Sequence, residues 1–470
     1  MKVVLFANTE WYLYNFRRSL AATLRDAGHE VLLVSPPGPY GERLRALGYR
    51  WLPAPMQRRS LNPFRELALV WWLRRMFQRE RVDLVHGFTI KSAVYGALAA
   101  RLSGVPARVS SVAGMGYVFT SDAPKARILR PLVRALLRMT LGGRGARLIL
   151  QNPDDVALFR RERLLRSEAI RLIPSSGVDC GRFSPGPEAV PSGPAAGLDR
   201  TLDSRVPPAP GSGVDEVPGE GLDLTQGIGL DHTEDSLVSS APGVGVGAGL
   251  GKGMAGVQGV DLDTASEGGR VRGHGAAREP ARFRVLLPAR LLWDKGLAEY
   301  VEASRLLRAE GRVVDFLLAG DPDPGNPASV PEATVRGWAE SGLVQWLGHV
   351  DDMPDLFRSV DAVVLPSYRE GLPKGLIEAA ACGLPLVATD VPGCREVVSD
   401  GVEGLLVPVR DARALADAIA RLQDAPALRV RLGRDARARA LAEYDERIVI
   451  RRTLAVYEEL LPRVVVTPGA

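Results

Sequence analysis

Two glutamates, Glu370 and Glu378, flank seven residues in the stretch EGLPKGLIE, where a loop is expected to enter a helix. Carboxylate oxygens match paired hydroxyl groups, so two such residues suit the binding of sugars. The first N–H groups of a helix favour a diphosphate. The loop-to-helix entry here consists of Gly371, Leu372, Pro373 and Lys374. The stretch indicates a receptor for a phosphorylated sugar, but two glutamates at this spacing also occur by chance in helices.

A pair of cations occurs in LLPARLLWDKG, where Arg290 directly follows a predicted strand and Lys295 comes five residues later. When a sugar–phosphate bond breaks, negative charge accumulates on the departing diphosphate. Two fixed cations would therefore stabilise the transition state more than the ground state, and losing one would cost roughly 3–4 kcal/mol. The alternative interpretation is a solvated pair of charges at the start of a helix.

The segment FLLAGDPDPGNP contains Asp321 and Asp323 at the spacing of a metal-binding D-x-D motif. It follows a predicted strand that ends at Gly320, a candidate ligand-binding residue, and we interpret the aspartates as part of a loop. Because Arg290 and Lys295 already supply positive charge, we predict no metal and no other cofactor. Three cysteines without close-spaced pairs also argue against a zinc site and a disulfide framework.

Two series of short apolar runs would position these residues. In the first half the predicted strands are 3–8, 29–35, 82–87, 107–114 and 146–152, with helices such as 15–27 and 92–103 between them. In the second half they are 283–289, 314–320, 344–349, 361–367, 384–390 and 403–408. Runs that are apolar throughout and alternate with helices are typical of parallel, doubly wound α/β sheets, which bind ligands at the carboxyl ends of strands.

Residues 188–280 separate the two series and contain 20 glycines but no aromatic residue. We expect a disordered insertion, because it lacks the apolar surface needed to offset its ordering entropy; weak strands are the alternative. We therefore divide the chain into domains at 1–187 and 281–445 and a C-terminal helix with a tail at 446–470 that crosses back to the first domain. We expect deletion of the insertion to leave turnover nearly unchanged.

The composition is that of a globular protein, with 46% hydrophobic and 24% charged residues. No run of 18 apolar residues and no signal-like start occurs, so the expected location is the cytoplasm. Residues 1–187 carry 30 Lys+Arg against 13 Asp+Glu, a net charge of +17, which leaves −12 for the remainder of a chain of net charge +5. This asymmetry favours an anionic partner of the first half, although arginines that simply solvate helices would give the same counts.

The motifs together resemble the family-4 retaining glycosyltransferases, whose E-x7-E and R-x4-K signatures correspond to EGLPKGLIE and RLLWDK. The resemblance extends over essentially the whole chain except 188–280 and is similar to the branch that makes capsules and lipid-linked oligosaccharides. It implies the GT-B fold, an α/β architecture in which two doubly wound Rossmann-like domains face an interdomain cleft. It also supports the interpretation of the aspartate segment as a loop.

The resemblance implies that Glu378 binds the ribose and Glu370 the donor sugar. Gly348 and His349 would border the nucleobase, with a structural turn as the alternative. The candidate acceptor-side residues are Asn8, Asn15, His86, Lys91, Gly114 and Gly116. Many family members have a histidine in the loop after the fifth strand, where this chain has Ala113, so the role of that position is in doubt. His86 could substitute for it, although a lone histidine at a strand end is more often structural.

Two basic amphipathic segments predict contact with the inner leaflet of a membrane. In 125–141, arginines at 127, 130, 134 and 138 lie opposite a series of aliphatic residues. In 64–77, Trp71 and Trp72 adjoin Arg74 and Arg75. Such helices suit an anionic interface. Ordinary core-facing helices with arginine-rich outer faces are the alternative.

The resemblance implies a retaining, metal-independent enzyme that moves a hexose or N-acetylhexosamine from a nucleotide diphosphate sugar, with UDP expected. The implied acceptor is a lipid-linked glycan in surface polysaccharide biosynthesis, and no nucleic acid partner is expected. The sequence identifies neither the sugar nor the acceptor nor the linkage. Two alternatives remain open: a UDP-sugar 2-epimerase on the same fold, and a non-catalytic protein that binds an anionic ligand through its basic half.

Overall fold

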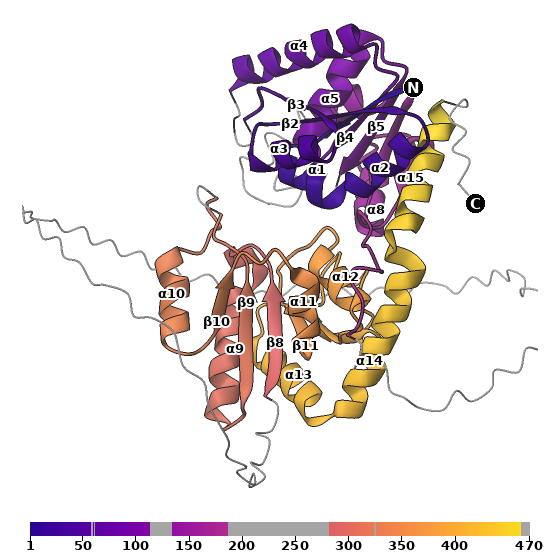
Figure 1. Cartoon of the computed structure of the whole chain (residues 1–470). Helices are drawn as coiled ribbons and strands as arrows, with labels where there is room; N and C mark the ends of the chain where they lie inside the picture. Colours follow the sequence, from indigo (N-terminus) through magenta and orange to yellow (C-terminus); the bar gives the residue numbers. More distant parts are fainter. Residues whose placement is uncertain (58–59, 61, 113–133, 187–281, 324–325, 462–470) are drawn as a thin grey trace, which may run out of the picture. The chain divides into compact units, whose positions relative to one another are not determined.

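The computed structural model describes residues 1–57, 60, 62–112, 134–186, 282–323 and 326–461. The first half contains a parallel sheet of seven strands (Figure 1). In spatial order they are β3 (Arg50–Pro53), β2 (Glu30–Ser35), β1 (Lys2–Phe6), β4 (Leu84–Phe88), β5 (Ala107–Val112), β6 (Ala146–Leu150) and β7 (Ile170–Leu172). The chain order reverses between β1 and β4, which makes their carboxyl ends the switch point where such sheets bind ligands.

Helices cover both faces of this sheet because its strands are apolar throughout and have no face suited to water. The helices are α1 (Glu10–Phe16), α2 (Arg18–Asp26), α3 (Pro39–Ala46), α4 (Pro63–Glu80), α5 (Ile90–Ser103) and α8 (Pro153–Arg161), and residues 134–141 are also helical. One core lies between the sheet and α4, where Leu69, Leu73 and Phe77 are almost fully buried.

The second half contains a parallel sheet of six strands (Figure 1). In spatial order they are β10 (Gln345–Gly348), β9 (Val314–Ala319), β8 (Phe283–Pro288), β11 (Ala362–Leu365), β12 (Leu386–Thr389) and β13 (Gly404–Val407). The associated helices are α9 (Leu297–Ala309), α10 (Glu332–Glu340), α11 (Met353–Arg358), α12 (Lys374–Ala381), α13 (Ala412–Asp424) and α14 (Pro426–Arg439). Here the order reverses between β8 and β11.

The last helix, α15 (Glu446–Leu460), follows α14 in the chain but packs on the first sheet. Val449, Leu454, Val456 and Tyr457 share a hydrophobic core with residues of β1, β2 and β5. Arg147 and Arg171, from β6 and β7, form ion pairs with Glu459 at 2.8 and 2.5 Å. The C-terminal helix therefore completes the core of the N-terminal half. Its last turn is also held there by the ion pairs of Glu459.

The structure differs from the predicted elements in one divided helix and in two short edge strands. The segment expected to form one helix over 15–27 is divided at Arg17, whose φ of −130° ends α1 and precedes α2. Strands β3 and β7 were not predicted, because they are edge strands of four and three residues and contain no long apolar run. The predicted insertion at 188–280 lies outside the described residues.

Candidate active site

Four carboxyl strand ends meet at one edge of the second sheet, because β10, β9, β8 and β11 are parallel neighbours. The segment containing Arg290 follows β8, and the loop before α12 follows β11. These two strands are the pair at which the strand order reverses. The topology thus brings the cationic and acidic motifs to the switch point, where doubly wound sheets bind their ligands.

At this edge Lys295 and Glu370 form an ion pair with 2.5 Å between Nζ and Oε1. Their side chains are only 16% and 11% exposed. Ser367 donates a hydrogen bond of 2.8 Å to the same carboxylate oxygen, which fixes its direction. The ammonium group retains further N–H donors. An anion could therefore bind at Lys295 while the pair with Glu370 persists.

Two glycines allow the backbone segments that carry this pair to approach one another. Gly296, with φ of 72°, lies so close to Pro366 that a Cβ atom would be 2.1 Å from its carbonyl oxygen. Gly393, with φ of 85°, would place a Cβ atom 2.6 Å from the carbonyl oxygen of Glu370. Both positions require glycine, because a side chain would meet rigid backbone. Neither Gly393 nor Ser367 was predicted as a site residue.

We expect Gly393→Ala to displace the loop that holds Glu370 and to lower activity by about tenfold or more, since backbone strain and the clash together cost a few kcal/mol. Gly401→Ala is the matched control, because Gly401 also has a positive φ of 75° but no atom lies within 4 Å of its added Cβ. Turnover and urea unfolding of both variants check this. Equal activity losses in the two variants would show that strain alone, not the contact with the Glu370 loop, matters.

Helix α12 begins at Lys374 and carries Glu378 one turn later. Lys374 Nζ lies 3.7 Å from Glu378 Oε1. Burial raises the pKa of the Glu378 carboxyl and lowers the pKa of the Lys374 ammonium, because it disfavours both charges. The segment Gly371–Pro373 forms the non-helical entry, and no side chain caps the helix start. The helix start therefore offers N–H groups and a cation to an anion, with a carboxylate behind them.

Arg290 forms an ion pair with Asp323, at 2.8 Å between Nη1 and Oδ2. The arginine side chain is 54% exposed, whereas that of Asp323 is 15% exposed. Asp323, the second aspartate of the D-x-D segment, therefore orients the side chain of Arg290. Among the described residues, no group of three or more His, Cys, Asp or Glu side chains is arranged to hold a metal ion.

Gly320 and Gly348 lie at the ends of β9 and β10 and are joined by a hydrogen bond of 2.8 Å from the Gly320 N–H to the Gly348 carbonyl. Both have positive φ, 141° and 65°. A Cβ atom at Gly320 would lie 2.0 Å from the carbonyl oxygen of Ala289, so this glycine allows the ends of β9 and β8 to lie close together. His349 is half exposed, with Nε2 3.4 Å from Asp351. Both predicted roles, nucleobase contact and structural turn, are compatible with this position.

The acceptor-side candidates of the first half are not gathered in one place by their contacts. Asn8 follows β1, whereas Asn15 is exposed on α1 and donates to the Trp11 carbonyl at 3.0 Å. Lys91 is bound by Glu66 at 2.8 Å and by two backbone carbonyls, which anchors the chain before α4. Lys91 thus stabilises the packing of the start of α5 against the segment before α4. Gly114, Gly116 and Ala113 lie outside the described residues.

His86 is a structural residue in this arrangement. Its ring is 1% exposed, and its two nitrogens lie 2.6 Å from the Tyr457 hydroxyl and 2.6 Å from the Ser111 hydroxyl. Burial holds its pKa well below the ordinary value. The neutral imidazole therefore connects β4 to β5 and α15. The interpretation of His86 as a substitute for a donor-side histidine gains no support from the geometry.

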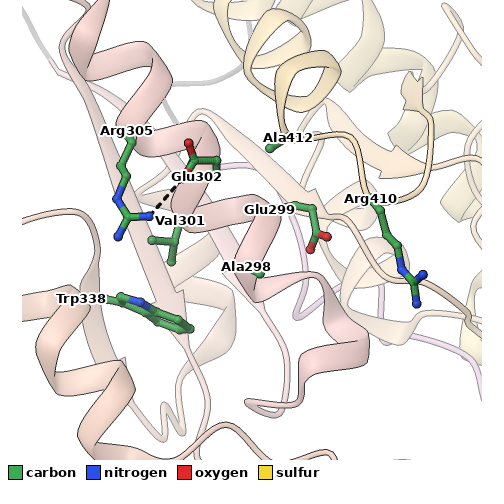
Figure 2. A pocket seen from close by; sticks show the side chains of 8 residues that line it. All are labelled: Ala298, Glu299, Val301, Glu302, Arg305, Trp338, Arg410 and Ala412. Atoms are coloured by element: carbon green, nitrogen blue, oxygen red, sulfur yellow. Dashed lines mark hydrogen bonds and ion pairs between the residues drawn. The ribbon is translucent and has the colours of Figure 1, made fainter. Parts of the chain in front are cut away.

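A surface hollow lies beside α9 (Figure 2). It is lined by Ala298, Glu299, Val301, Glu302, Arg305, Trp338, Arg410 and Ala412. The Tyr368 hydroxyl donates to Glu299 at 2.8 Å, and the Arg410 guanidinium lies over the Tyr368 ring. None of the predicted site residues lines the hollow. Glu299 and Arg410 from its wall hold Tyr368, two residues before Glu370.

The two doubly wound parallel sheets, with the cationic and acidic motifs at the carboxyl edge of the second, are the arrangement expected of a GT-B glycosyltransferase. Residues 15–175 match the family model described as "Glycosyl transferase 4-like domain", and residues 282–425 match "Glycosyl transferases group 1". Together these matches cover more than half of the chain. The chain belongs to this family of glycosyltransferases, as its motifs predicted.

Two curated relatives are similar along most of the chain. A Campylobacter jejuni N,N'-diacetylbacillosaminyl-diphospho-undecaprenol alpha-1,3-N-acetylgalactosaminyltransferase is 25% identical over 99% of this chain and 100% of its own length. An Escherichia coli UDP-Gal:alpha-D-GlcNAc-diphosphoundecaprenol alpha-1,3-galactosyltransferase is 22% identical over 79% of this chain and 74% of its own length. The solved structure of Anabaena HepE in complex with UDP covers 98% of this chain and 100% of its own, with a TM-score of 0.64 at 15% identity. This last likeness confirms the predicted GT-B fold.

Proposed function

We propose that this glycosyltransferase moves an N-acetylhexosamine or a hexose from a UDP-sugar to a sugar linked to a polyprenyl diphosphate. The observation that carries the proposal is the partly buried Lys295–Glu370 pair at the same sheet edge as Arg290 and the start of α12. The names of the two relatives, both of which act on undecaprenyl diphosphate-linked sugars, supply the substrate class.

In the proposed mechanism, Arg290, Lys295 and the N–H groups at the start of α12 hold the diphosphate and stabilise the charge that it gains as the glycosidic bond breaks. Glu378 accepts hydrogen bonds from the ribose and Glu370 from the donor sugar. The departing phosphate oxygen takes the proton of the acceptor hydroxyl on the same face of the sugar, so configuration is retained without a protein nucleophile. Because protein cations neutralise the leaving group, we propose that no metal is needed.

The test is a panel of UDP- and GDP-sugars incubated with the full chain, with and without a membrane extract as acceptor, in parallel reactions that contain no addition, EDTA, or EDTA followed by excess Mg²⁺. We expect one UDP-sugar to add its residue mass to an extracted lipid, and NMR of the product to show the anomeric configuration of the donor. A new sugar diphosphate formed without acceptor would instead identify an epimerase. Transfer that stops with EDTA and returns with Mg²⁺ would contradict metal independence.

We further propose that the enzyme works at an anionic membrane surface through one face of its first half. The structure alters the sequence-based choice of residues: Trp72 packs partly against the core, whereas Phe64, Leu67 and Trp71 of α4 are 81%, 68% and 48% exposed. In the predicted segment 125–141, Arg134 forms a hydrogen bond with Glu162, and Arg138 donates to the backbone carbonyls of Glu162 and Arg163. These two arginines therefore face protein. Arg127 and Arg130 lie outside the described residues.

Two basic side chains lie beside one residue of this α4 face, which we define as Phe64, Leu67 and Trp71. The guanidinium groups of Arg74 and Arg75 lie 4.7 and 5.4 Å from the Trp71 ring centroid. Exposed aromatic and aliphatic groups next to arginines suit the boundary between headgroups and acyl chains. No helix among the described residues has the length and apolarity required to cross a bilayer.

We expect the triple substitution of Phe64, Leu67 and Trp71 by serine to lower binding to phosphatidylglycerol-containing vesicles by more than tenfold, since each side chain would lose roughly 1.5–3 kcal/mol of burial. Val430→Ser, at an exposed valine of α14, is the control. Vesicle co-sedimentation measures binding, and hydrolysis of the UDP-sugar in detergent checks that the active site is intact. Unchanged sedimentation of the triple variant would refute the proposed membrane face.

A further inference from the structure

Polar groups at the carboxyl end of β4 are buried without hydrogen-bond partners. Thr89, which follows the strand, has φ of 69°, a conformation that is rare for a β-branched residue and is often found at functional sites. Its Oγ1 is buried and unbonded. Ser92, in the first turn of α5, is 0% exposed, and its Oγ is also unbonded. Two orphaned hydroxyl groups thus lie within three residues of one another.

A buried cation lies against the same strand end. Arg17 is 5% exposed, and its guanidinium carbon lies 4.3 Å from the ring centroid of Phe88, the residue before Thr89. Its Nη2 donates to the Tyr12 hydroxyl at 2.8 Å, while its Nε has no partner. No described carboxylate forms an ion pair with Arg17, in contrast to Lys91, which Glu66 neutralises. An uncompensated buried guanidinium is costly to the free protein.

The place of these groups in the fold is that of a ligand site. Thr89 follows β4, and the first sheet reverses its strand order between β1 and β4. Helix α5, of 14 residues, starts here without a side-chain cap. Its first N–H groups therefore add to the positive potential. All of the unbonded groups are donors or can donate, and none of them is negatively charged.

We propose that Arg17, Thr89 and Ser92 form a phosphoryl-binding site, the β4 site, which holds the diphosphate of the lipid-linked acceptor. This inference rests on the proposed function for its choice of ligand. A phosphoryl group offers several acceptor oxygens and matches a guanidinium, two hydroxyls and a helix start at once. Binding would neutralise the buried cation and satisfy the orphaned hydroxyls, which explains why the free structure tolerates both. The acceptor would then be held by its diphosphate in the first half and the donor by its own in the second.

The test uses the full chain with saturating UDP, so that the donor diphosphate site is filled, and titrates inorganic pyrophosphate and then farnesyl diphosphate by calorimetry. We expect both to bind to the wild type. Arg17→Met should weaken binding by about tenfold or more, because a charge-assisted hydrogen bond is lost, and Ser92→Ala should weaken it several-fold. Arg18→Met, at the exposed neighbouring arginine, is the matched control and should bind as the wild type does.

Measurements of stability distinguish an arginine that binds a ligand from one that only stabilises the fold. Without ligand, we expect Arg17→Met and Ser92→Ala to be as stable as the wild type or more so, since each removes an unsatisfied buried group. Pyrophosphate should raise the melting temperature of the wild type but not of Arg17→Met. The proposal is overturned if pyrophosphate does not bind in the presence of UDP, if Arg17→Met and Ser92→Ala bind it normally, or if Arg18→Met weakens it equally. Failure of UDP to bind would instead count against the proposed function.

Discussion

Replacing Lys295 with Met is expected to lower kcat by about 100- to 1,000-fold, the effect of losing one preorganised group that stabilises developing negative charge. The ammonium group lies at the sheet edge with Arg290 and is held 2.5 Å from Glu370. Its charge is therefore fixed before the donor arrives and requires no reorganisation during bond cleavage. Single-turnover transfer kinetics at saturating UDP-sugar measure the loss. A decrease smaller than fivefold would remove Lys295 from the mechanism.

Stability separates this chemical role from the ion pair. Lys295→Met leaves the largely buried Glu370 carboxylate with Ser367 but without its cation, so we expect the free energy of unfolding to fall by about 1–3 kcal/mol. The double variant Lys295→Met/Glu370→Gln should regain stability but not activity. Arg282→Gln, at an exposed arginine just before β8 and at the opposite end of that strand, serves as control and should change neither property.

The second large effect is on ligand affinity, and it should differ between Glu378 and Glu370 because we expect them to bind different parts of the donor. If Glu378 binds the ribose, Glu378→Gln should weaken both UDP and UDP-sugar by about 10- to 100-fold, because hydrogen bonds to a charged acceptor are lost. If Glu370 binds the sugar, Glu370→Gln should weaken UDP-sugar and leave the affinity for UDP nearly unchanged. Calorimetry with both ligands and both variants gives the four dissociation constants that distinguish these roles.

The folded structure makes Glu378→Gln an interpretable variant. Burial raises the pKa of this carboxyl, and its distance of 3.7 Å from Lys374 is longer than the 2.5 Å of the Lys295–Glu370 pair, so a neutral amide should destabilise the fold less than Lys295→Met does. A Glu378→Gln variant with normal UDP affinity would contradict its assignment to the ribose. Parallel losses of UDP affinity in both variants would mean that the two glutamates act on the diphosphate loop and not on separate hydroxyl groups.

The sequence predicted the central strands of both sheets because each is a run of apolar, often β-branched residues, and such runs are recognisable without any neighbour. It also identified the cation and glutamate motifs, whose residue types match a diphosphate and hydroxyl groups. It missed β3 and β7, which are short edge strands stabilised by pairing to one neighbour. It placed Trp72 with Trp71 on the membrane side, whereas one residue along a helix rotates a side chain by about 100°, here toward the core.

By itself, the sequence determined the fold class, the family and the residue types of the proposed donor site, since these depend on local pattern and residue type. Only the tertiary structure decided that Lys295 pairs with Glu370, that Asp323 orients Arg290 and that Gly393 lies against the Glu370 loop. It also decided that His86 is enclosed by Tyr457 and Ser111, while Arg17 is buried and forms no ion pair with any carboxylate in the described part of the chain. Each of these facts depends on residues brought together from distant positions in the chain, because strand order and helix packing set such contacts and no local spacing encodes them.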